Sequence, residues 1–249
     1  MSTKLRTPST LKSISSLHPA FSDAKILGGL APEELHEVGR SFRERAFPRG
    51  AVLFHEGARA TTYNLIAEGQ VKLVQTSPEG LDVILHILGP GELAGALPNL
   101  GEGTYPATAV ALVDVVAFSI GPEDFNAILR RFPQVALNLL RFAAGVIQVS
   151  HRRLRELATE RVEQRIARTL ARLVRQMGVK SAEGITLTAP LTRQDVADLA
   201  GTTLFTVSRT LKAWDRRGIL RTSRGRLTIL DPHALIALGE DLHEPPAPV

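Results

Sequence analysis

The chain has 249 residues, of which 44% are hydrophobic and 22% charged, a composition typical of a globular protein with one large domain or two modest ones. It contains no cysteine, which excludes disulfides, thiolate metal sites and cysteine-held iron–sulfur clusters. Residues 1–130 carry 11 Lys and Arg against 14 Asp and Glu, a net charge of −3, whereas residues 131–249 carry 19 against 11, a net of +8. The basic half suggests contact with a polyanion, although a solvated basic surface would have the same composition.

The two ends of the chain are expected to be flexible tails. Residues 1–20 are rich in Ser, Thr and Lys, and residues 241–249 are rich in proline. The N-terminal segment lacks the long apolar run of a signal peptide. No stretch approaches the ~20 apolar residues that cross a membrane. We therefore expect a cytoplasmic protein with no membrane partner.

Residues 21–132 show a pattern typical of an antiparallel β domain. A short helix is predicted over 31–42, because Pro32 suits a first helical position and acidic residues follow it. Short strand-like runs then occupy 51–57, 61–75, 81–88 and 107–120, separated by glycine-containing turns. This regular punctuation predicts a sandwich or barrel. A helix is expected to begin in "GPEDF" (121–125).

A long helix is predicted from Pro133 to about Thr159, and it carries an apolar row with alternating spacings of three and four residues. This heptad spacing favours a parallel pairing of two copies of the helix, and so a homodimer, over packing on the helix's own domain, although the latter is the commoner arrangement. His151 is the polar member, and polar residues in such rows often fix register. The row comprises Leu137, Leu140, Ala144, Ile147, His151, Leu154 and Ala158.

The C-terminal part predicts a winged helix-turn-helix. An amphipathic helix over 159–178 ends at Gly178, and two short helices follow over 191–200 and 204–217. The pair has the required small contact at Ala197 and a turn at Gly201. Apolar side chains at Leu199, Val207 and Leu211 would lock it, and Thr192 and Thr203 would cap its helices. The following "LRTSRGRLTI" (220–229) predicts a hairpin wing, and a last helix is expected to open at Asp231–Pro232.

The outer face of the second short helix is the predicted reader of double-stranded DNA. Arg209 can bind guanine O6 and N7 in bidentate fashion, and Ser208 can serve either kind of base edge. Leu204 and Phe205 are apolar and can only touch a thymine methyl group. The alternative for Arg209 is an intramolecular salt bridge with Asp195 or Asp215. The remaining predicted contacts, chiefly with phosphates, are Thr192, Arg193, Thr203, Thr206, Lys212 and Arg224.

Four motifs make the chain resemble the Crp/Fnr family of bacterial transcription regulators over roughly residues 24–230. They are "FPRGAVLFHEG", "GPGEL", "RVEQRIARTLARL" and "LTRQDVADLAGTTLFTVSRTLKAW". The resemblance implies an α+β fold with three parts: a jelly-roll sensor domain over 21–132, a dimerisation helix over 133–160, and a winged helix-turn-helix domain over 161–240. It also implies palindromic promoter DNA and RNA polymerase as partners. Ser208 and Arg209 fall on positions that read bases in the family, whereas Phe205 replaces a glutamate that accepts from cytosine in many members.

The sensor domain departs from the cyclic-AMP-responsive members of the family. Ala96 stands where those members have a ribose-binding glutamate, and Pro106–Ala107 stand where they have an Arg–Ser pair for the phosphate. A buried cyclic phosphate would need a positive partner and donors, so cyclic nucleotides are not expected to bind. The pattern "YPATAVALVDV" looks more like the branch that responds to nitrogen oxides, where haem is the usual proposal. The effector is unidentified, with haem as one candidate, and the expected pocket residues are Leu97, Leu100, Tyr105, Ala107 and His151.

Two other classes of function compete with a DNA-binding regulator. One is a ligand-binding signalling module whose helix-turn-helix contacts protein, which the basic C-terminal half and Arg209 argue against. The other is an enzyme. The sequence shows no nucleophile–base pairing, metal-ligand spacing or phosphate loop, so we expect no catalytic and no metal site.

Overall fold

The computed structural model describes residues 18–240, apart from Glu102, Arg224 and Gly225. By their contacts these residues divide into two compact units. Unit 1 comprises the ranges Met1–Gln75 and Leu85–Ile147, and unit 2 comprises Thr76–Ile84 and Gln148–Val249. The division falls after Ile147, inside the long helix predicted over 133–160.

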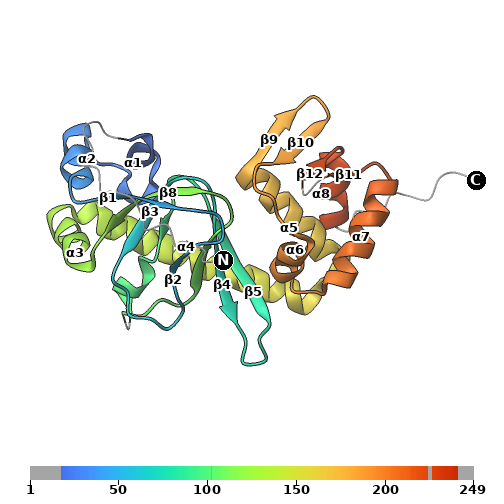
Figure 1. The fold of residues 1–249 in the computed structure, drawn as a ribbon, viewed down its shortest axis with the longest axis horizontal. Helices are drawn as coiled ribbons and strands as arrows, with labels where there is room; N and C mark the ends of the chain where they lie inside the picture. The colour runs from blue at the N-terminus through green and yellow to red at the C-terminus, as the bar shows by residue number, and fades with distance from the viewer. Residues whose placement is uncertain (1–17, 102, 224–225, 241–249) are drawn as a thin grey trace, which may run out of the picture. The chain divides into compact units, whose positions relative to one another are not determined.

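Unit 1 is built on two four-stranded antiparallel sheets, in which β1, β8 and β3 run side by side (Figure 1). The orders are β1-β8-β3-β6 in one sheet and β2-β7-β4-β5 in the other. This non-sequential order is that of a jelly roll, so the predicted fold class is confirmed. The strands are β1 Arg43–Phe47, β2 Val52–Phe54, β3 Tyr63–Glu68, β4 Val71–Thr76, β5 Asp82–Leu88, β6 Leu93–Ala94, β7 Thr108–Ala111 and β8 Val115–Ile120.

Aromatic packing joins the start of the chain to the roll. The helix α1 (Pro19–Asp23) contacts β3, and its Phe21 is fully buried, with its ring 4.9 Å from that of Phe118 and 5.2 Å from that of Phe42. Ala20 is buried as well. Pro19 and Ala20, which the sequence assigns to a tail over 1–20, therefore belong to a helix packed on the roll. Residues 1–17 and the other predicted tail, 241–249, lie outside the described residues.

Short helices and the long helix α4 complete unit 1. The short ones are the 3-10 helices η1 (Lys25–Leu27) and η2 (Leu97–Leu100), α2 (Pro32–Gly39) and α3 (Pro122–Arg131). The helix α4 (Pro133–Thr159) has 27 residues and is about 40 Å long at 1.5 Å per residue. Its first turns bury Val135 and Leu139 in the core of the roll. No single described helix is long and apolar enough to cross a membrane; α3 and α4 meet that test only as a pair bent by 113°.

Unit 2 places helices beside a small sheet of order β11-β12-β10-β9 (Figure 1). Helix α5 contacts α6, α8 and the β9–β10 hairpin, and α6 contacts α7. The β9–β10 hairpin was not predicted, because each strand has only four residues and the first follows directly on a helix. The elements are α5 Val162–Met177, β9 Gly178–Ser181, β10 Gly184–Leu187, α6 Arg193–Ala200, α7 Leu204–Arg216, β11 Leu220–Ser223, β12 Arg226–Ile229 and α8 Pro232–Glu240.

Candidate nucleic-acid interface and helix seam

The two caps predicted for the helix-turn-helix are present. The hydroxyl of Thr192 accepts a hydrogen bond from the Asp195 backbone N–H at 3.0 Å, and the Asp195 carboxylate accepts one from the Thr192 N–H at 2.9 Å. This reciprocal box satisfies free donors at the start of α6. The hydroxyl of Thr203 accepts from the Thr206 N–H at 3.2 Å and so starts α7.

Apolar contacts lock the two helices together as the sequence predicts. Ala197, Val207 and Leu211 are at most 1% exposed, and Leu199 is also buried. A further anchor was missed: Trp214 is fully buried on α7, and its indole Nε1 donates to the Glu163 carboxylate on α5 at 2.8 Å. A single tryptophan on the same helical face as Val207 and Leu211 was the signal that could have identified it.

The turn between α6 and α7 is tied to the end of α4. Gly201 adopts φ 61° and ψ 52°, a left-handed conformation that favours glycine. A Cβ atom there would lie 2.6 Å from Cδ2 of Leu157, a residue of α4. Arg165 donates to the carbonyls of Ala200 and Gly201, each at 3.1 Å, and to the Glu160 carbonyl at 2.9 Å. One guanidinium thus joins the residue after α4 to the turn that precedes the recognition helix.

The outer face of α7 is polar and basic apart from its first two residues. Leu204, Phe205, Arg209 and Lys212 are exposed, while Thr206 and Ser208 are half-buried. The guanidinium carbon of Arg209 lies 5.9 Å from the centroid of the Phe205 ring, a cation–π contact. The two carboxylates expected as alternative partners of Arg209 bind elsewhere. Asp195 accepts from Thr192 within the capping box, and Asp215 accepts from the Thr222 hydroxyl at 3.4 Å.

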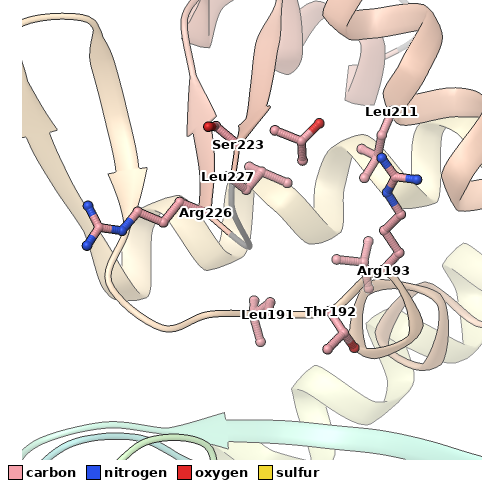
Figure 2. Close-up of a pocket in the computed structure, with 9 residues that line it drawn as sticks. Leu191, Thr192, Arg193, Leu211, Ser223, Arg226 and Leu227 are labelled. Carbon is pink, nitrogen blue, oxygen red and sulfur yellow. The ribbon is translucent and has the colours of Figure 1, made fainter.

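A hollow of about 250 Å³ lies where α6 and α7 meet the wing formed by β11 and β12. Its lining combines four Leu or Val residues, three with hydroxyl groups and two arginines. In Figure 2, the Arg226 side chain of β12 extends away from the other labelled residues, and Arg193 of α6 lies on the opposite side of the group, next to Thr192. Such groups suit phosphate oxygens. The lining residues are Leu191, Thr192, Arg193, Val196, Leu211, Thr222, Ser223, Arg226 and Leu227.

Three basic or polar positions in this region were not predicted. They are Ser223 and Arg226, which line the hollow, and Arg216, which is exposed one turn beyond Lys212 on α7. The spacing of Arg209, Lys212 and Arg216 by three and four residues could have identified the last of these. Arg224, which the sequence predicts as a phosphate contact, lies outside the described residues.

The predicted heptad row lies on the solvent-facing side of α4. All seven of its members are exposed in the single chain, and Ile147 is 56% exposed. Val146, Val149 and Leu157 are also exposed, so the apolar surface is broader than the row. The row therefore does not pack on its own subunit along the length of α4, the alternative that the sequence left open.

The last turns of α4 are fixed on their other face by buried charges. Glu156 is 3% exposed, and both of its carboxylate oxygens accept from Arg172 of α5, at 3.0 and 2.9 Å. Arg172 also donates to the Thr169 hydroxyl at 3.0 Å. Arg153 donates to the Ile84 carbonyl at 3.2 Å; burial, and then the nearby charge of Arg172, lower the pKa of Arg153. These hydrogen bonds satisfy both oxygens of the buried Glu156 carboxylate. Removing either Glu156 or Arg172 would leave the other as an unpaired buried charge, which is strongly destabilising.

The five residues expected to form an effector pocket differ in burial. Tyr105 and Ala107 are buried in unit 1, where Leu100 is exposed and Leu97 is half-buried, and His151 is exposed in unit 2. The effector pocket stays a prediction.

The Tyr105 side chain is itself part of the packing of the roll. Its ring stacks on Phe54 with centroids 3.9 Å apart and planes 12° apart. Its hydroxyl donates to the Thr62 carbonyl at 2.7 Å and accepts from the backbone N–H groups of Thr61 and Thr62 at 3.2 and 3.0 Å. A Cβ atom at Gly95 would lie 3.0 Å from the Tyr105 ring and 3.1 Å from the Phe54 ring. In this structure, therefore, the Tyr105 side chain packs against Phe54 and Thr62 inside the roll.

Three histidines of unit 1 that could ligate the haem suggested by the sequence have protein neighbours or face solvent in this structure. His18 accepts from the Ala20 N–H at 3.2 Å through Nδ1 and packs 5.3 Å from Phe118, ring to ring. Nε2 of His86 lies 3.5 Å from the Glu92 carboxylate, and His55 is exposed. A hollow of about 270 Å³ elsewhere in unit 1 is lined by Ser41, Arg43, Arg45, Thr62, Ser119, Ile120, Gly121 and Asp124, without a histidine. Within the described ranges, no three His, Asp or Glu residues are grouped as metal ligands.

The fold and the capped, winged helix pair define the class as a DNA-binding regulator with a cyclic-nucleotide-binding-like domain. Comparisons with known proteins agree: residues 44–132 match the cyclic nucleotide-binding domain, and residues 164–238 match the Crp-like helix-turn-helix domain. The chain is 35% identical over 216 residues to the cyclic AMP receptor protein of Thermus thermophilus, covering 86% of this chain and 97% of the relative. The chain therefore belongs to the Crp/Fnr family of transcription regulators.

Other relatives and solved structures give the same result. The nitrogen fixation regulation protein FixK of Bradyrhizobium diazoefficiens is 29% identical over 225 residues, covering 88% of this chain and 91% of the relative. The crystal structure of the Thermus thermophilus catabolite activator protein matches with 33% identity and a TM-score of 0.51, over 88% of this chain and all of that one. The structure of FixK2 from Bradyrhizobium japonicum, at 22% identity, matches in fold with a TM-score of 0.70 over 79% and 96% of the chains.

Proposed function

We propose that this regulator acts as a homodimer that reads palindromic promoter sites through α7, and that its sensor domain responds to something other than a cyclic nucleotide. The observation that carries the DNA-binding part is the outer face of α7, which exposes Arg209 and Lys212 while Val207 and Leu211 are buried. The N-terminal residues of a recognition helix contact base edges, and Arg209 is the one with a bidentate match to guanine.

The proposed phosphate contacts surround this helix. Thr192 and Thr203 are at helix N-termini, and Arg193 lines the hollow by the wing. Backbone N–H groups at helix starts and guanidinium groups are the usual partners of phosphate oxygens. Ser223 and Arg226 join the predicted set because they line the same hollow.

The experiment that tests DNA binding is a titration of the full-length protein with a promoter duplex and with a random duplex of the same length, at several salt concentrations. We expect the promoter duplex to bind at least ~10³-fold more tightly, as is typical of specific binding. The logarithm of affinity is expected to fall linearly with that of salt. Equal affinity for both duplexes would instead favour a helix-turn-helix that contacts protein.

The proposed dimer rests on the exposed row on α4. An uncovered stripe of Leu140, Ile147 and Leu154 at heptad spacing is stabilised when a second copy covers it. A two-fold dimer then requires half-sites about one helical turn apart, ~34 Å. RNA polymerase is the further partner that the family resemblance implies.

The proposal that cyclic nucleotides are not the signal rests on the side chains of the segment between Gly91 and Thr108. Ala96 is buried, and Pro106 offers no N–H, while its carbonyl accepts from the Gln75 side chain at 2.8 Å. Between Gly91 and Thr108 the chain has no lysine or arginine. This segment itself therefore offers no charged partner for an anionic phosphate.

Calorimetric titration with cyclic AMP and cyclic GMP tests this part, and cyclic AMP is the sharper probe because one relative is named as its receptor. We expect no saturable heat at micromolar concentration. Saturable binding of either nucleotide would overturn the proposal. The relatives include, by name, both a cAMP-activated global regulator and a nitrogen fixation regulation protein, so the nitrogen-oxide branch stays a prediction.

A further inference from the structure

Phe205 is the second residue of α7, the proposed recognition helix. It is 74% exposed, more than any other large hydrophobic side chain in the described part of the chain. It contributes nothing to the lock between α6 and α7, which Ala197, Val207 and Leu211 form. Its place on the outer face of α7 instead puts an apolar ring where base edges are read.

The chemistry of the ring restricts what it can read. Phenylalanine has no donor or acceptor for the polar pattern of the major groove. The one apolar feature that a base pair presents there is the C5 methyl group of thymine, and phenylalanine is among its known partners. A cytosine that carries a methyl group at C5 presents the same feature. Phe205 also lacks a carboxylate that could accept from the N4 amino group of cytosine.

The geometry links this ring to Arg209. The two residues are four positions apart and so share one face of the helix. The guanidinium carbon of Arg209 lies 5.9 Å from the ring centroid. This separation is shorter than two base-pair steps of about 3.4 Å. The ring also limits the freedom of the long Arg209 side chain, so less conformational entropy is lost when it binds a guanine.

We propose that Phe205 and Arg209 form one reading unit, which selects a C5-methylated pyrimidine within two base pairs of the guanine that Arg209 binds. The methylated pyrimidine is thymine in ordinary DNA and 5-methylcytosine in modified DNA. The proposal rests on the proposed DNA-binding function and adds to it the chemical class of the second base. Binding of this regulator is therefore sensitive to cytosine methylation at that position.

The test begins with selection of a preferred duplex by the wild-type protein from a randomised library. At each selected pyrimidine within two base pairs of the guanine, four matched duplexes then carry thymine, uracil, cytosine or 5-methylcytosine, and fluorescence anisotropy gives their affinities. Replacing thymine by uracil removes only the methyl group. We expect a loss of about fourfold per half-site, since burying one such group contributes about 0.8 kcal/mol. Replacing cytosine by 5-methylcytosine should raise the affinity by a similar factor.

Two variants distinguish the apolar contact of Phe205 with the methyl group from its cation–π contact with Arg209. Phe205→Glu should lose the difference between thymine and uracil and select cytosine instead, and Phe205→Leu should keep the methyl dependence while binding the guanine less tightly. Because Phe205 is exposed, neither change disturbs the core. Equal affinity of the wild type for thymine and uracil duplexes, with guanine selection intact, would overturn this inference and leave the proposed DNA-binding function standing. If no sequence is selected, the proposed DNA-binding function itself fails.

Discussion

Helices α4 and α7 both expose one face along their length, but the chemistry of the two faces differs. The exposed row on α4 is apolar from Leu137 to Leu154, apart from His151, whereas α7 exposes Arg209, Lys212 and Arg216 beyond its first two residues. Solvated cations at helical spacing suit a polyanion, because they neutralise its charges and release the counterions condensed on it. An uncovered apolar row suits a second helix, which removes it from water.

The chemistry of the exposed side chains, more than the helical structure that both segments share, therefore indicates which kind of partner each face binds. The end of α4 and the start of α7 are also mechanically connected. Leu157 of α4 contacts Gly201, and Arg165 binds the carbonyls of Glu160, Ala200 and Gly201. A change in one surface is therefore expected to reach the other through these residues.

The largest effect is expected from a charge placed in the apolar row on α4, which tests whether a second copy of the helix covers that row. Ile147→Lys would bury an ammonium group without a partner in the proposed dimer, which is strongly unfavourable. We expect a monomer in sedimentation velocity and specific DNA binding weaker by about 10²-fold or more, since a monomer can engage only half of a palindrome. Val149→Lys is the matched control, because Val149 is exposed on α4 outside the row. A dimeric Ile147→Lys protein would show that the row has another role.

The second test removes the proposed guanine reader on α7. Arg209→Ala should weaken the free energy of DNA binding by about 1–3 kcal/mol per half-site and relax the preference for guanine, because alanine cannot form the bidentate pair of hydrogen bonds. The dimer should remain intact, since Arg209 is remote in sequence from the α4 row. Affinity measured against duplexes with each base at that position checks both parts. Unchanged affinity and base preference would refute the assignment.

The third test loosens the connection between the two surfaces. Arg165→Ala removes three hydrogen bonds from a guanidinium to backbone carbonyls, and we expect unit 2 to become less stable by about 1–2 kcal/mol of unfolding free energy. DNA affinity should fall while the dimer constant is unchanged, because the turn before α7 is less well held. Arg168→Ala is a useful control, since Arg168 contacts the Glu160 carboxylate at 3.2 Å but not the turn. Equal effects of the two variants on DNA affinity would argue against a specific role for Arg165.

A smaller effect is expected at Lys212, the next cation on α7. If its ammonium group binds a phosphate, Lys212→Ala should weaken binding about equally for all sequences, and the salt slope should decrease by about one for each phosphate that is no longer neutralised. Measurements at four salt concentrations on specific and random duplexes would show this. A decrease in affinity that depended on the DNA sequence would show that Lys212 contacts a base and not a phosphate.

The smallest expected change is at the polar member of the row. His151→Leu replaces an exposed imidazole with the apolar residue that the heptad position favours, so the dimer should become modestly tighter. Polar residues at such positions fix register at a cost in stability. Sedimentation equilibrium would give the dimer constant. A weaker dimer would show that His151 makes a favourable contact across the interface.

Much of the helix-turn-helix could be predicted from the sequence because local rules determine it. The caps at Thr192 and Thr203, the turn at Gly201 and the burial of Val207 and Leu211 depend on residues within a few positions of one another. The burial and stacking of Tyr105 could not be predicted. They depend on contacts with Phe54 and Thr62, which lie more than 40 positions away in the sequence, and no short-range pattern indicates those contacts.

The stack of Tyr105 on Phe54 has a kinetic and energetic consequence for the sensor. Any effector that enters the roll at this place must first displace a ring held by three hydrogen bonds of its hydroxyl. The tyrosine thus acts as an internal competitor, and the apparent affinity of an effector equals its intrinsic affinity multiplied by the fraction of molecules with the ring displaced. Association would then be limited by the opening of the roll, with a rate that becomes independent of effector concentration once that concentration is high.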